Sequence, residues 1–220
     1  MTYLAIQNTY DQVQIGLCKN QTIIARTTID KIHANAQCIP ALDVLLSEHN
    51  LIVSDLTYII TNCGPGPFTT LRVVLATING IHYASQIPLV GIDSLDAIIE
   101  EYRNPAYINV ALLNAFNQDV YYAIADTNGI RKGCQNISHF IAELAHIYPQ
   151  QPIQFVGNGA LLHQEHILNA FGSYAIMPTP MPETCSLDQI HRMGVKKWHE
   201  GKGQRTPLTP HYLKSAHPKL

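Results

Sequence analysis

The sequence predicts an α/β protein of two domains, each a mixed β-sheet with helices on its faces. Consecutive β-rich runs open the chain, continuous apolar runs then alternate with helical patterns, and weaker strand and helix patterns follow after residue 105. Because 46% of the 220 residues are hydrophobic, the chain has enough apolar material for a core in each half. Its length suits two domains of about 100 residues each.

The first half begins with three β-rich runs separated by short polar connections, which is typical of consecutive hairpins. Val13, Ile15 and Leu17 alternate with other residues and indicate a strand with one buried face. Pro40 falls inside the helical pattern that follows, so that helix either starts near Pro40 or kinks there. After a continuous apolar strand and another helix, Ser94 can cap a third helix. The expected strands are 3–9, 12–18, 22–28, 57–63 and 88–92, and the expected helices are 33–49, 68–84 and 95–102.

These elements follow the order β-β-β-α-β-α-β-α. Three antiparallel strands followed by strands that helices connect form the mixed sheet of a ribonuclease-H-like or actin-like domain. We place the domain boundary near residues 103–105, which gives domains 1–103 and 104–220, the second a more degenerate copy. The expected strands of the second domain are 107–114, 119–126 and 153–158, and its expected helices are 138–148, 160–171 and 187–200, the last capped by Ser186.

Charge and cysteine content exclude several function classes. The net charge is −2 and only 14 residues are Lys or Arg, whereas a free-standing nucleic-acid binder usually shows a basic patch. A modest basic cluster lies between Lys196 and Lys219. The five cysteines are scattered without a CxxC pair, which argues against a disulfide framework or a zinc knuckle. Since the sequence shows no export signal and no run of about 18 apolar residues, we expect a cytoplasmic protein that does not enter a membrane.

The segment GPGPFTTLR (64–72) joins the fourth expected strand to a helix and is the most informative part of the sequence. Two glycines and two prolines make a stiff turn, and backbone N–H groups at the start of a helix can bind an anion. The segment lacks the lysine of GxxxxGK[ST] and the spacing of GxGxxG. It therefore predicts a rigid strand-to-helix corner, with an anion or nucleotide loop as the alternative. The residues of that loop would be Gly64, Gly66 and Thr69.

The helix expected over 68–84 has two apolar stripes. Leu71, Val74, Leu75, Ile78 and Ile81 form a stripe suited to packing on the sheet. The second stripe holds small residues at four-residue spacing, so another helix can approach it closely. A glycine inside a helix costs about 1 kcal/mol relative to alanine and usually has a packing reason. The residues of this second stripe are Val73, Ala76, Gly80 and Ala84, of which the last three are spaced by four.

A helix that is apolar on two sides is either wholly buried or shared between its own core and a partner. The helix expected over 33–49 also has apolar residues on more than one face, which favours a surface shared with a partner. Two such helices could supply half of a four-helix interface. The expected residues of this partner interface are Ile39, Leu42, Leu46, Thr69, Arg72, Val73, Ala76, Thr77 and Gly80.

The block NCGPGPFTTLRVVLATINGIH (62–82) resembles the pattern GRGPGSFTGLRIGVATAKGLA of the TsaB family, also called YeaZ, whose members serve bacterial tRNA threonylcarbamoyladenosine biosynthesis. Supporting blocks of the family resemble IPLVGIDSLDA (87–97), DVYYAIAD (119–126), VGNGA (156–160) and PHYLKSA (210–216). The resemblance covers essentially the whole chain, and its first block is highly specific.

This resemblance implies an actin-like fold of two domains, with no enzymatic activity and no cofactor of its own. Family members pair, through helices of the N-terminal domain, with TsaD, the metal-dependent subunit that transfers threonylcarbamoyl to the adenosine beside the anticodon. The ATPase TsaE joins that complex, and members alone often form homodimers through the same helices. We therefore expect a scaffold subunit that activates a TsaD-like partner and meets tRNA only through the complex.

The chain departs from the family pattern at several positions. The first strand of the family commonly ends in Asp-Thr-Ser, whereas this chain has Gln7-Asn8-Thr9. Gln7 cannot supply the carboxylate with which actin-like ATPases hold a metal–nucleotide. Residues 114–116 replace Asp-Ala-Arg with Asn-Ala-Phe, and Pro67 and Thr70 replace Ser and Gly in the loop. These changes favour a protein without catalysis and leave the contacts of the loop open.

The candidate metal ligands stand alone in the sequence. The catalytic paralogue has an HxxxH pair on its first helix, and here His33 is followed by Gln37 at the second position. One imidazole facing a glutamine is a poor site for iron or zinc. His163 and His166 could share a helix face, but no third ligand accompanies them. We therefore expect no metal site.

A nucleophile is equally unsupported by the sequence. Cys63 could pair with His82, but nothing in the sequence orients such a pair, and a small buried residue is the simpler interpretation of Cys63. We therefore expect no catalytic residue. The alternatives are a metallopeptidase-like, glycoprotease-type hydrolase and an actin-like sugar or acetate kinase, and Gln7 disfavours the kinase.

Overall fold

The computed structural model describes residues 1–214, which form two compact units. Unit 1 comprises Met1–Asp93 and Ser186–His211, and unit 2 comprises Ser94–Cys185 and, of the described residues, Tyr212–Lys214. This division differs from the expected domains 1–103 and 104–220, because the helix after the fifth strand belongs to unit 2 and the helix near the C-terminus belongs to unit 1. The end of the block PHYLKSA and Lys219 lie outside the described residues.

Unit 1 contains a five-stranded sheet whose strands were all expected from the sequence. They are β1 (Thr2–Asn8), β2 (Gln12–Lys19), β3 (Thr22–Asp30), β4 (Ile59–Asn62) and β5 (Leu89–Ile92), in the spatial order β3-β2-β1-β4-β5. β1 is antiparallel to β2, with Leu4 opposite Leu17, and parallel to β4, with Leu4 opposite Ile59. Asn20 and Gln21 both have positive φ, which suits the two-residue turn between β2 and β3.

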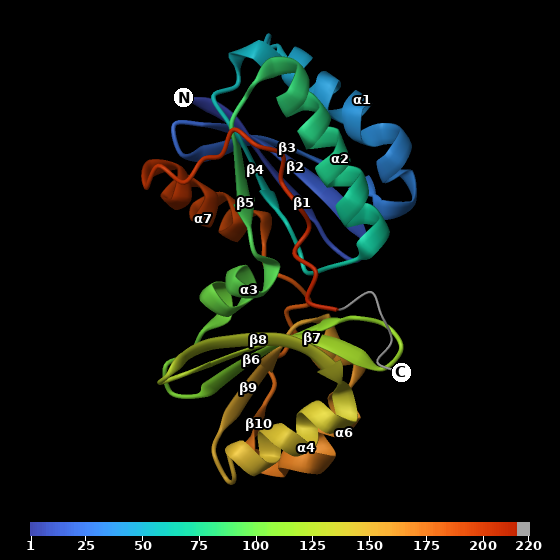
Figure 1. Ribbon diagram of the computed structural model, residues 1–220, viewed down its shortest axis with the longest axis vertical. Coiled ribbons are helices and arrows are strands. Elements are labelled where there is room, and N and C mark those ends of the chain that lie inside the picture. The colour runs from blue at the N-terminus through green and yellow to red at the C-terminus, as the bar shows by residue number, and fades with distance from the viewer. Residues whose placement is uncertain (215–220) are drawn as a thin grey trace. The chain divides into compact units, whose positions relative to one another are not determined.

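Helices cover both faces of this sheet (Figure 1). They are α1 (Ala34–Ser47) and α2 (Phe68–Ser85) on one face and α7 (Leu187–His199) on the other. A 3₁₀ turn over Lys31–His33 leads into α1, and another lies at Val53–Asp55. Pro40 lies in the interior of α1, so the alternative that the helix starts at Pro40 is wrong.

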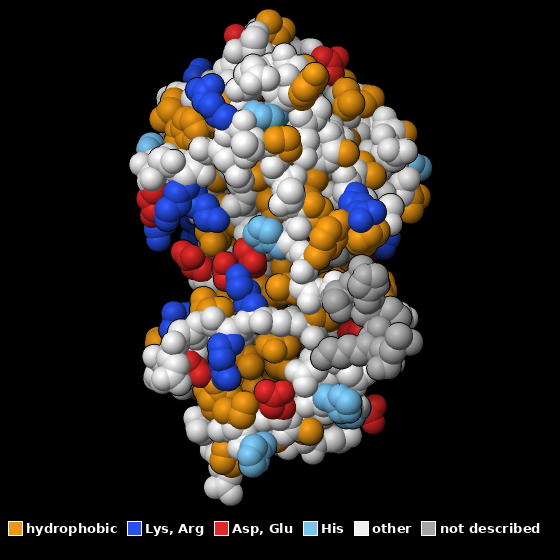
Figure 2. All heavy atoms as spheres, viewed as in Figure 1, with side chains coloured by type: hydrophobic (Ala, Val, Ile, Leu, Met, Phe, Trp, Pro, Cys, Tyr) orange, Lys and Arg blue, Asp and Glu red, His pale blue; other side chains and the backbone are white. Residues whose placement is uncertain are grey.

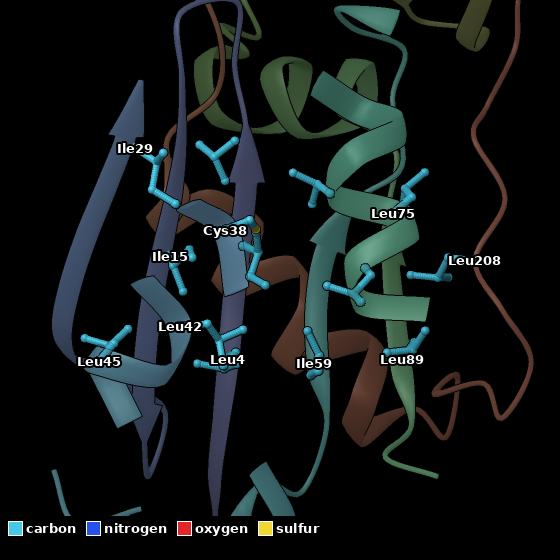
Figure 3. Close-up of a cluster of buried hydrophobic side chains, with 14 of the residues drawn as sticks. Leu4, Ile15, Ile29, Cys38, Leu42, Leu45, Ile59, Leu75, Leu89 and Leu208 are labelled. Carbon is cyan, nitrogen blue, oxygen red and sulfur yellow. The ribbon is translucent and has the colours of Figure 1, made fainter. Parts of the chain in front are cut away.

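The hydrophobic core of unit 1 lies between the sheet and the pair of helices α1 and α2. Figure 3 shows Leu42 and Leu45 of α1 and Leu75 of α2 in one cluster with Leu4 and Ile59 of the sheet. Each of these side chains is 4% exposed or less. Because burying one leucine or isoleucine contributes about 1.5–3 kcal/mol, this cluster fixes both helices on the sheet.

Helix α7 covers the opposite face through aromatic side chains. The rings of Tyr3 and Tyr58 stack at 4.3 Å, and Tyr58 stacks on Trp198 of α7 at the same distance. The Tyr3 hydroxyl forms a 2.9 Å hydrogen bond with Nε2 of His191, also on α7. The Ser186 side chain accepts a hydrogen bond from the backbone N–H of Gln189, as expected for the cap of this helix.

The segment after α7 is tied to unit 1 by backbone and side-chain contacts. Gln204 forms an antiparallel bridge with Leu89 of β5. Further on, Leu208 is 4% exposed and belongs to the same hydrophobic core. The Asn79 amide of α2 donates to the Leu208 carbonyl at 2.9 Å and accepts from its N–H at 2.8 Å.

Unit 2 repeats the topology of unit 1 with a second five-stranded sheet, in the order β10-β9-β6-β7-β8. Three antiparallel strands come first, and the two later strands join in parallel. The strands are β6 (Ile108–Asn114), β7 (Asp119–Asp126), β8 (Gly129–Asn136), β9 (Ile153–Val156) and β10 (Ala175–Ile176). The helices are α3 (Ser94–Tyr102), α4 (Ile137–Ile147), α5 (Asn158–Leu162) and α6 (Gln164–Phe171), followed by a 3₁₀ turn over Gly172–Tyr174.

Three features of unit 2 differ from the expectation. Strand β8 was not predicted from the sequence, because it lacks an apolar run. Its residues are exposed or half-buried, as on an edge strand. Strand β10, which has only two residues, was not predicted either. The helix expected over 160–171 is two helices that meet at His163, whose φ of −111° is not helical.

The predicted fold class is confirmed, because the structure contains two mixed sheets with flanking helices, the actin-like arrangement. Within residues 1–214, none of the helices is long and apolar enough to cross a membrane.

Candidate partner-binding helical face

Helix α2 presents different residues to the core and to solvent. Leu71, Val74, Leu75 and Ile78 are buried, as the sheet-packing stripe predicts, and Ile81 is partly buried. The helix ends at Gln86, which has a left-handed φ of 60°. This stripe anchors α2 on the sheet, and the exposed residues of the helix lie on its other side.

The small-residue stripe of α2 lies on the solvent side. Ala76, Gly80 and Ala84 are all exposed, and a Cβ added at Gly80 would meet nothing within 4 Å. Tyr83 is 84% exposed on the same side of the helix. A large aromatic side chain beside small residues is typical of a surface against which a second helix packs closely.

The start of α2 adds an aromatic ring and a cation to this face. Phe68 is 52% exposed, and the Arg72 guanidinium lies 3.7 Å from the centre of its ring. The two residues are one helical turn apart, so the contact is a local cation–π pair. Thr69, between them, is also exposed. Aromatic and arginine side chains are the types most often found at the energetic centres of protein interfaces.

The expected residues Val73 and Thr77 lie at the junction of α1 and α2. Val73 is half-buried and packs against the core of unit 1. The Thr77 hydroxyl donates to the Val73 carbonyl at 2.9 Å, and it also lies near the Cys38 thiol of α1. These two side chains therefore fix the spacing of the helices more than they offer free surface.

On α1 the structure separates the expected interface residues into two groups. Ile39 is 63% exposed, in agreement with the interface hypothesis. Leu42 and Leu46 are only 3% and 2% exposed, so the expectation that they form a partner surface fails for this unit, because they fill its core. Figure 3 shows Leu42 among the core side chains. Positions 38, 42, 45 and 46 share the helix face toward the sheet, whereas Ile39 is rotated away from it.

Three exposed apolar residues of this surface were not predicted from the sequence. Val44 of α1 is 55% exposed, and Phe68 and Tyr83 of α2 are exposed as well. A usable signal was present, since each is a large apolar residue out of phase with the buried stripe of its own helix. Figure 2 shows hydrophobic side chains mixed with uncharged ones and with basic side chains over the part of unit 1 that α1 and α2 form. We call this surface the α1–α2 face; its exposed residues are Ile39, Val44, Phe68, Thr69, Arg72, Ala76, Gly80, Tyr83 and Ala84.

The glycine-rich turn before α2 is a tight corner. Gly64 has a φ of +92°, and a Cβ there would lie 2.8 Å from the Leu71 side chain. The peptide bond between Gly64 and Pro65 is cis. Pro67 is the N-cap residue of α2 and makes no side-chain capping hydrogen bond. His211 donates its backbone N–H to the Cys63 carbonyl at 2.8 Å, so the C-terminal segment lies against the same corner.

Amide side chains lie at the end of β1 beside this corner. The Asn62 amide donates to the Asn8 carbonyl at 3.0 Å and to its side-chain oxygen at 2.8 Å, and the Asn8 N–H donates back to Asn62 at 2.9 Å. Gln7 is 1% exposed. The side chains of residues 7 and 8 therefore cannot neutralise a cation, and the expected anion loop at Gly64, Gly66 and Thr69 stays a prediction.

The thiol that could serve as a nucleophile is protonated near neutral pH. Burial raises the pKa of Cys63 to about 12, and the nearby Lys197 only partly opposes this effect. His82 is 4% exposed, and its Nδ1 bonds to the Ile87 carbonyl at 2.8 Å. The thiolate, which is the reactive form, is therefore scarce in unit 1.

The candidate metal ligands do not assemble into a site. His33 is exposed at the end of a 3₁₀ turn. Burial lowers the pKa of His163, and the proximity of His166 lowers it further. In the described part of the chain, no three His, Cys, Asp or Glu side chains come together as a metal site.

Comparisons with known families give a consistent result over most of the sequence. The family model described as TsaD, tRNA N6-adenosine threonylcarbamoyltransferase, matches residues 27–186. A Bacillus subtilis protein described as tRNA threonylcarbamoyladenosine biosynthesis protein TsaB is 24% identical over 98% of this chain and 95% of its own length. The Escherichia coli protein with the same description is 23% identical over 69% of this chain and 67% of its own length.

Solved structures agree with the fold. YeaZ from Pseudomonas aeruginosa superimposes with a TM-score of 0.69 at 17% identity, covering 96% of this chain and 100% of that one. A second Pseudomonas aeruginosa structure, described as similar to peptidase YEAZ, gives a TM-score of 0.70 at 18% identity over 97% and 99% of the two chains. The ethanolamine utilization protein EutJ from Carboxydothermus hydrogenoformans gives 0.51 at 11% identity over 87% and 88%.

Proposed function

The chain belongs to the TsaB (YeaZ) family of tRNA threonylcarbamoyladenosine biosynthesis proteins, and on that premise we propose that it is a non-catalytic subunit that binds and activates a TsaD-like partner through the α1–α2 face. A TsaE-like ATPase joins this complex, and tRNA meets the chain only within it. Without the partner, the same face pairs two copies of the chain. The single observation that carries this proposal is the exposed apolar surface of α1 and α2.

The physical case for docking rests on what this face exposes to water. Ile39, Val44, Phe68 and Tyr83 are each more than half exposed, so their burial against a partner releases a large apolar area. On α2, the small residues Ala76 and Gly80 leave room for the backbone of an approaching helix. Large anchors around a small-residue groove are the pattern of a packed helix–helix interface.

The family match supports the proposed choice of partner. Because the TsaD model matches residues 27–186, a TsaD-like protein is a relative of this chain over that range. Its own helices corresponding to α1 and α2 can then meet the α1–α2 face as a related surface, as two copies of one chain do in a two-fold pair. A four-helix contact between relatives needs no disordered segment and no charge steering.

The case against catalysis rests on the interior of unit 1. Gln7 and Asn8 are buried amides at the end of β1, where a metal–nucleotide would need a carboxylate. The pKa of Cys63 is raised to about 12 by burial, which disfavours a thiolate nucleophile. We therefore assign the chain an effect on the conformation of its partner, by preferential binding to the active state.

The docking surface is tested by adding bulk to the small-residue stripe. Ala76→Trp and Gly80→Leu are expected to weaken binding of the purified TsaD-like protein by about 100-fold or more, since a closely packed helix pair cannot admit the added atoms. Ala142→Trp, at an exposed position of α4, is the matched control and should bind normally. Size-exclusion chromatography and calorimetry measure complex formation, and circular dichroism checks the fold of each variant. Full complex formation by both interface variants contradicts the proposal.

The functional role is tested by reconstituting tRNA threonylcarbamoylation from purified components. We expect the modification to require this chain and to fall in parallel with partner binding in the Ala76→Trp and Gly80→Leu variants. Undiminished activity without the chain contradicts the scaffold function. Catalysis by the chain alone, lost on chelation, supports the metallopeptidase-like hydrolase instead.

A further inference from the structure

Unit 2 contains a hollow of about 700 Å³ at one end of its sheet. Its walls come from the loop before β6, the turn after β7, the end of α4 and the residues before β9, all within positions 103–152. The volume is in the range of small-molecule sites in proteins, which is about 300–1,000 Å³. Nothing in the proposed scaffold function uses this region, which lies wholly in unit 2.

One wall of the hollow is a hydrogen-bonded group of three side chains. The Tyr148 hydroxyl donates to Oδ2 of Asp126 at 2.5 Å, and Nη2 of Arg131 donates to the Tyr148 oxygen. The same Nη2 lies 3.5 Å from Oδ2 of Asp126, whose side chain is 8% exposed. The backbone N–H of Asn128 donates to the other oxygen of Asp126 at 2.7 Å. Both oxygens of the carboxylate are therefore occupied, and the group holds Arg131 in place.

Another part of the lining is a short loop that a buried amide holds in place. Asn109 is 3% exposed, and its side chain donates to the carbonyls of Asn104 and Tyr107 and accepts from the N–H of Asn104. These bonds fix the loop that carries Arg103 into the lining. Both polar atoms of the Asn109 side chain are used by these bonds within the loop. The charged group that this loop contributes to the hollow is therefore Arg103.

The two guanidinium groups keep unused donors. Every contact of Arg131 with Asp126 and Tyr148 goes through Nη2, so Nε and Nη1 have no hydrogen-bond partner among residues 1–214. Arg103 is exposed and makes no hydrogen bond or ion pair with the described residues. A guanidinium has five N–H donors in a planar fork that matches a carboxylate or a phosphate. With one aspartate against two arginines, the lining has a net charge of +1.

The remaining lining is apolar enough to hold an organic body. Pro105, Ile108, Ile147 and Pro152 line the space, and Tyr107 and Tyr148 add aromatic rings. We propose that this hollow is a binding site for a small organic anion, in which an apolar or aromatic body rests on these residues and one phosphate or carboxylate binds Arg103 and Arg131. The prior order of Asp126, Tyr148 and Asn109 lowers the entropy that binding costs.

The test uses the full-length chain and four probes, measured by calorimetry at low salt. AMP supplies an aromatic body with a phosphate, and N-benzoylglycine supplies one with a carboxylate. Adenosine has the body without the anion, and inorganic phosphate has the anion without the body. We expect AMP, N-benzoylglycine or both to bind, and at least about tenfold weaker binding for adenosine and inorganic phosphate.

Variants separate the site from general charge. Arg103→Ala and Arg131→Ala should each weaken the bound probe by about tenfold or more. Lys132→Ala is the matched control, because Lys132 is the next residue on β8 and pairs with Asp96 outside the lining. Arg103 makes no contact that the fold needs, so its variant remains informative if Arg131→Ala is unstable, and thermal unfolding checks both.

Three results would overturn the proposal. They are the absence of binding by both organic anions, equal binding of adenosine or inorganic phosphate, and equal loss in Lys132→Ala. Because these measurements use the chain without any partner, their outcome is independent of the TsaD-like complex.

Discussion

The two units of the chain share one topology and differ at the corner where the fourth strand meets its helix. In unit 1 this corner is Gly64-Pro65-Gly66 before α2, and in unit 2 it is Gly157-Asn158-Gly159 at α5. In each unit the backbone N–H of the last residue of the first strand donates to an asparagine side chain near the corner. Asn8 donates to Asn62 in unit 1, and Asn114 donates to Asn158 in unit 2. These shared contacts are consistent with a duplicated domain.

The two corners differ in how closely their glycines approach the first strand of the sheet. A Cβ at Gly157 or Gly159 would lie 2.1 Å or 2.9 Å from the backbone oxygen of Leu112, whereas one at Gly66 would meet only the Asn8 side chain at 3.9 Å. The helices that follow differ as well, since α2 runs unbroken for 18 residues and its counterpart is divided at His163. Of these two counterparts, α2 is the one that is long and has small exposed residues, as the proposed docking surface requires.

The largest expected effect is at the tight corner of unit 2. Gly157→Ala should reduce the free energy of unfolding by more than about 3 kcal/mol, because it adds left-handed strain to a clash with the Leu112 backbone. Gly129→Ala, also at positive φ but with open space around it, should cost only about 1 kcal/mol. Gly66→Ala, at the open glycine of the unit 1 corner, should change the value by less than about 0.5 kcal/mol. Urea denaturation measures all three, and an equal loss for Gly157 and Gly66 would remove the distinction between the corners.

A smaller effect distinguishes the two helices that cover opposite faces of the unit 1 sheet. Gly194 of α7 lies so close to β4 that a Cβ would be 2.3 Å from the Ile60 side chain, while Gly80 of α2 has open space. Gly194→Ala should therefore cost about 1–2 kcal/mol, even though alanine favours the helix. Gly80→Ala should stabilise the isolated chain by about 0.5–1 kcal/mol. The measurement is thermal or urea unfolding of the chain alone, and destabilisation by Gly80→Ala would mean that the stripe is already packed.

The smallest effect concerns a buried histidine in each unit. Burial lowers the pKa of both His191 and His163, so the unfolded chain binds more protons below about pH 6.5. Stability is therefore full above that pH and falls as the pH decreases through the folded-state pKa, by at most about 1.4 kcal/mol per pH unit for each histidine. Unfolding free energies between pH 8 and pH 5 measure this slope.

Leucine variants assign the slope to each unit. His191→Leu should cost about 1 kcal/mol at pH 8, since the buried Tyr3 hydroxyl loses its partner. His163→Leu should cost little at pH 8, because Nε2 of His163 has no hydrogen-bond partner among the described residues. Both variants should flatten the acid dependence, and an unchanged profile in both would show that other groups cause it.

Much of the fold could be predicted because the local signals and the tertiary structure agree. The alternation at Val13, Ile15 and Leu17 correctly marks β2, in which Gly16 and Cys18 are buried as well. Ser186 caps α7 as expected. The edge strand β8 has Arg131 and Lys132 where an apolar run would be needed for prediction. The division into units could not be read locally, because it depends on which sheet α3 and α7 cover.

The candidate site was predictable in part for the same reason. The phase of Ala76 and Gly80 against the buried stripe of α2 gives their exposure correctly. Leu42 and Leu46 were assigned to the partner surface because a helix with scattered apolar residues does not reveal which face meets the sheet. That choice is made by long-range packing on β2 and β3, which one helix sequence does not contain.

The contacts of α7 and Leu208 with unit 1 also set an order for synthesis. The sheet of unit 2 and the helices α3 to α6 all precede Cys185 in the sequence. This unit therefore has all these elements as soon as the chain up to Cys185 has left the ribosome. Unit 1 begins the chain but lacks one cover of its sheet until Leu187–His199 has emerged, and lacks Leu208 until later still. The half that is made first is thus completed last, and during translation the uncovered face of β1 and β4, with Tyr3 and Tyr58, is open to chaperones.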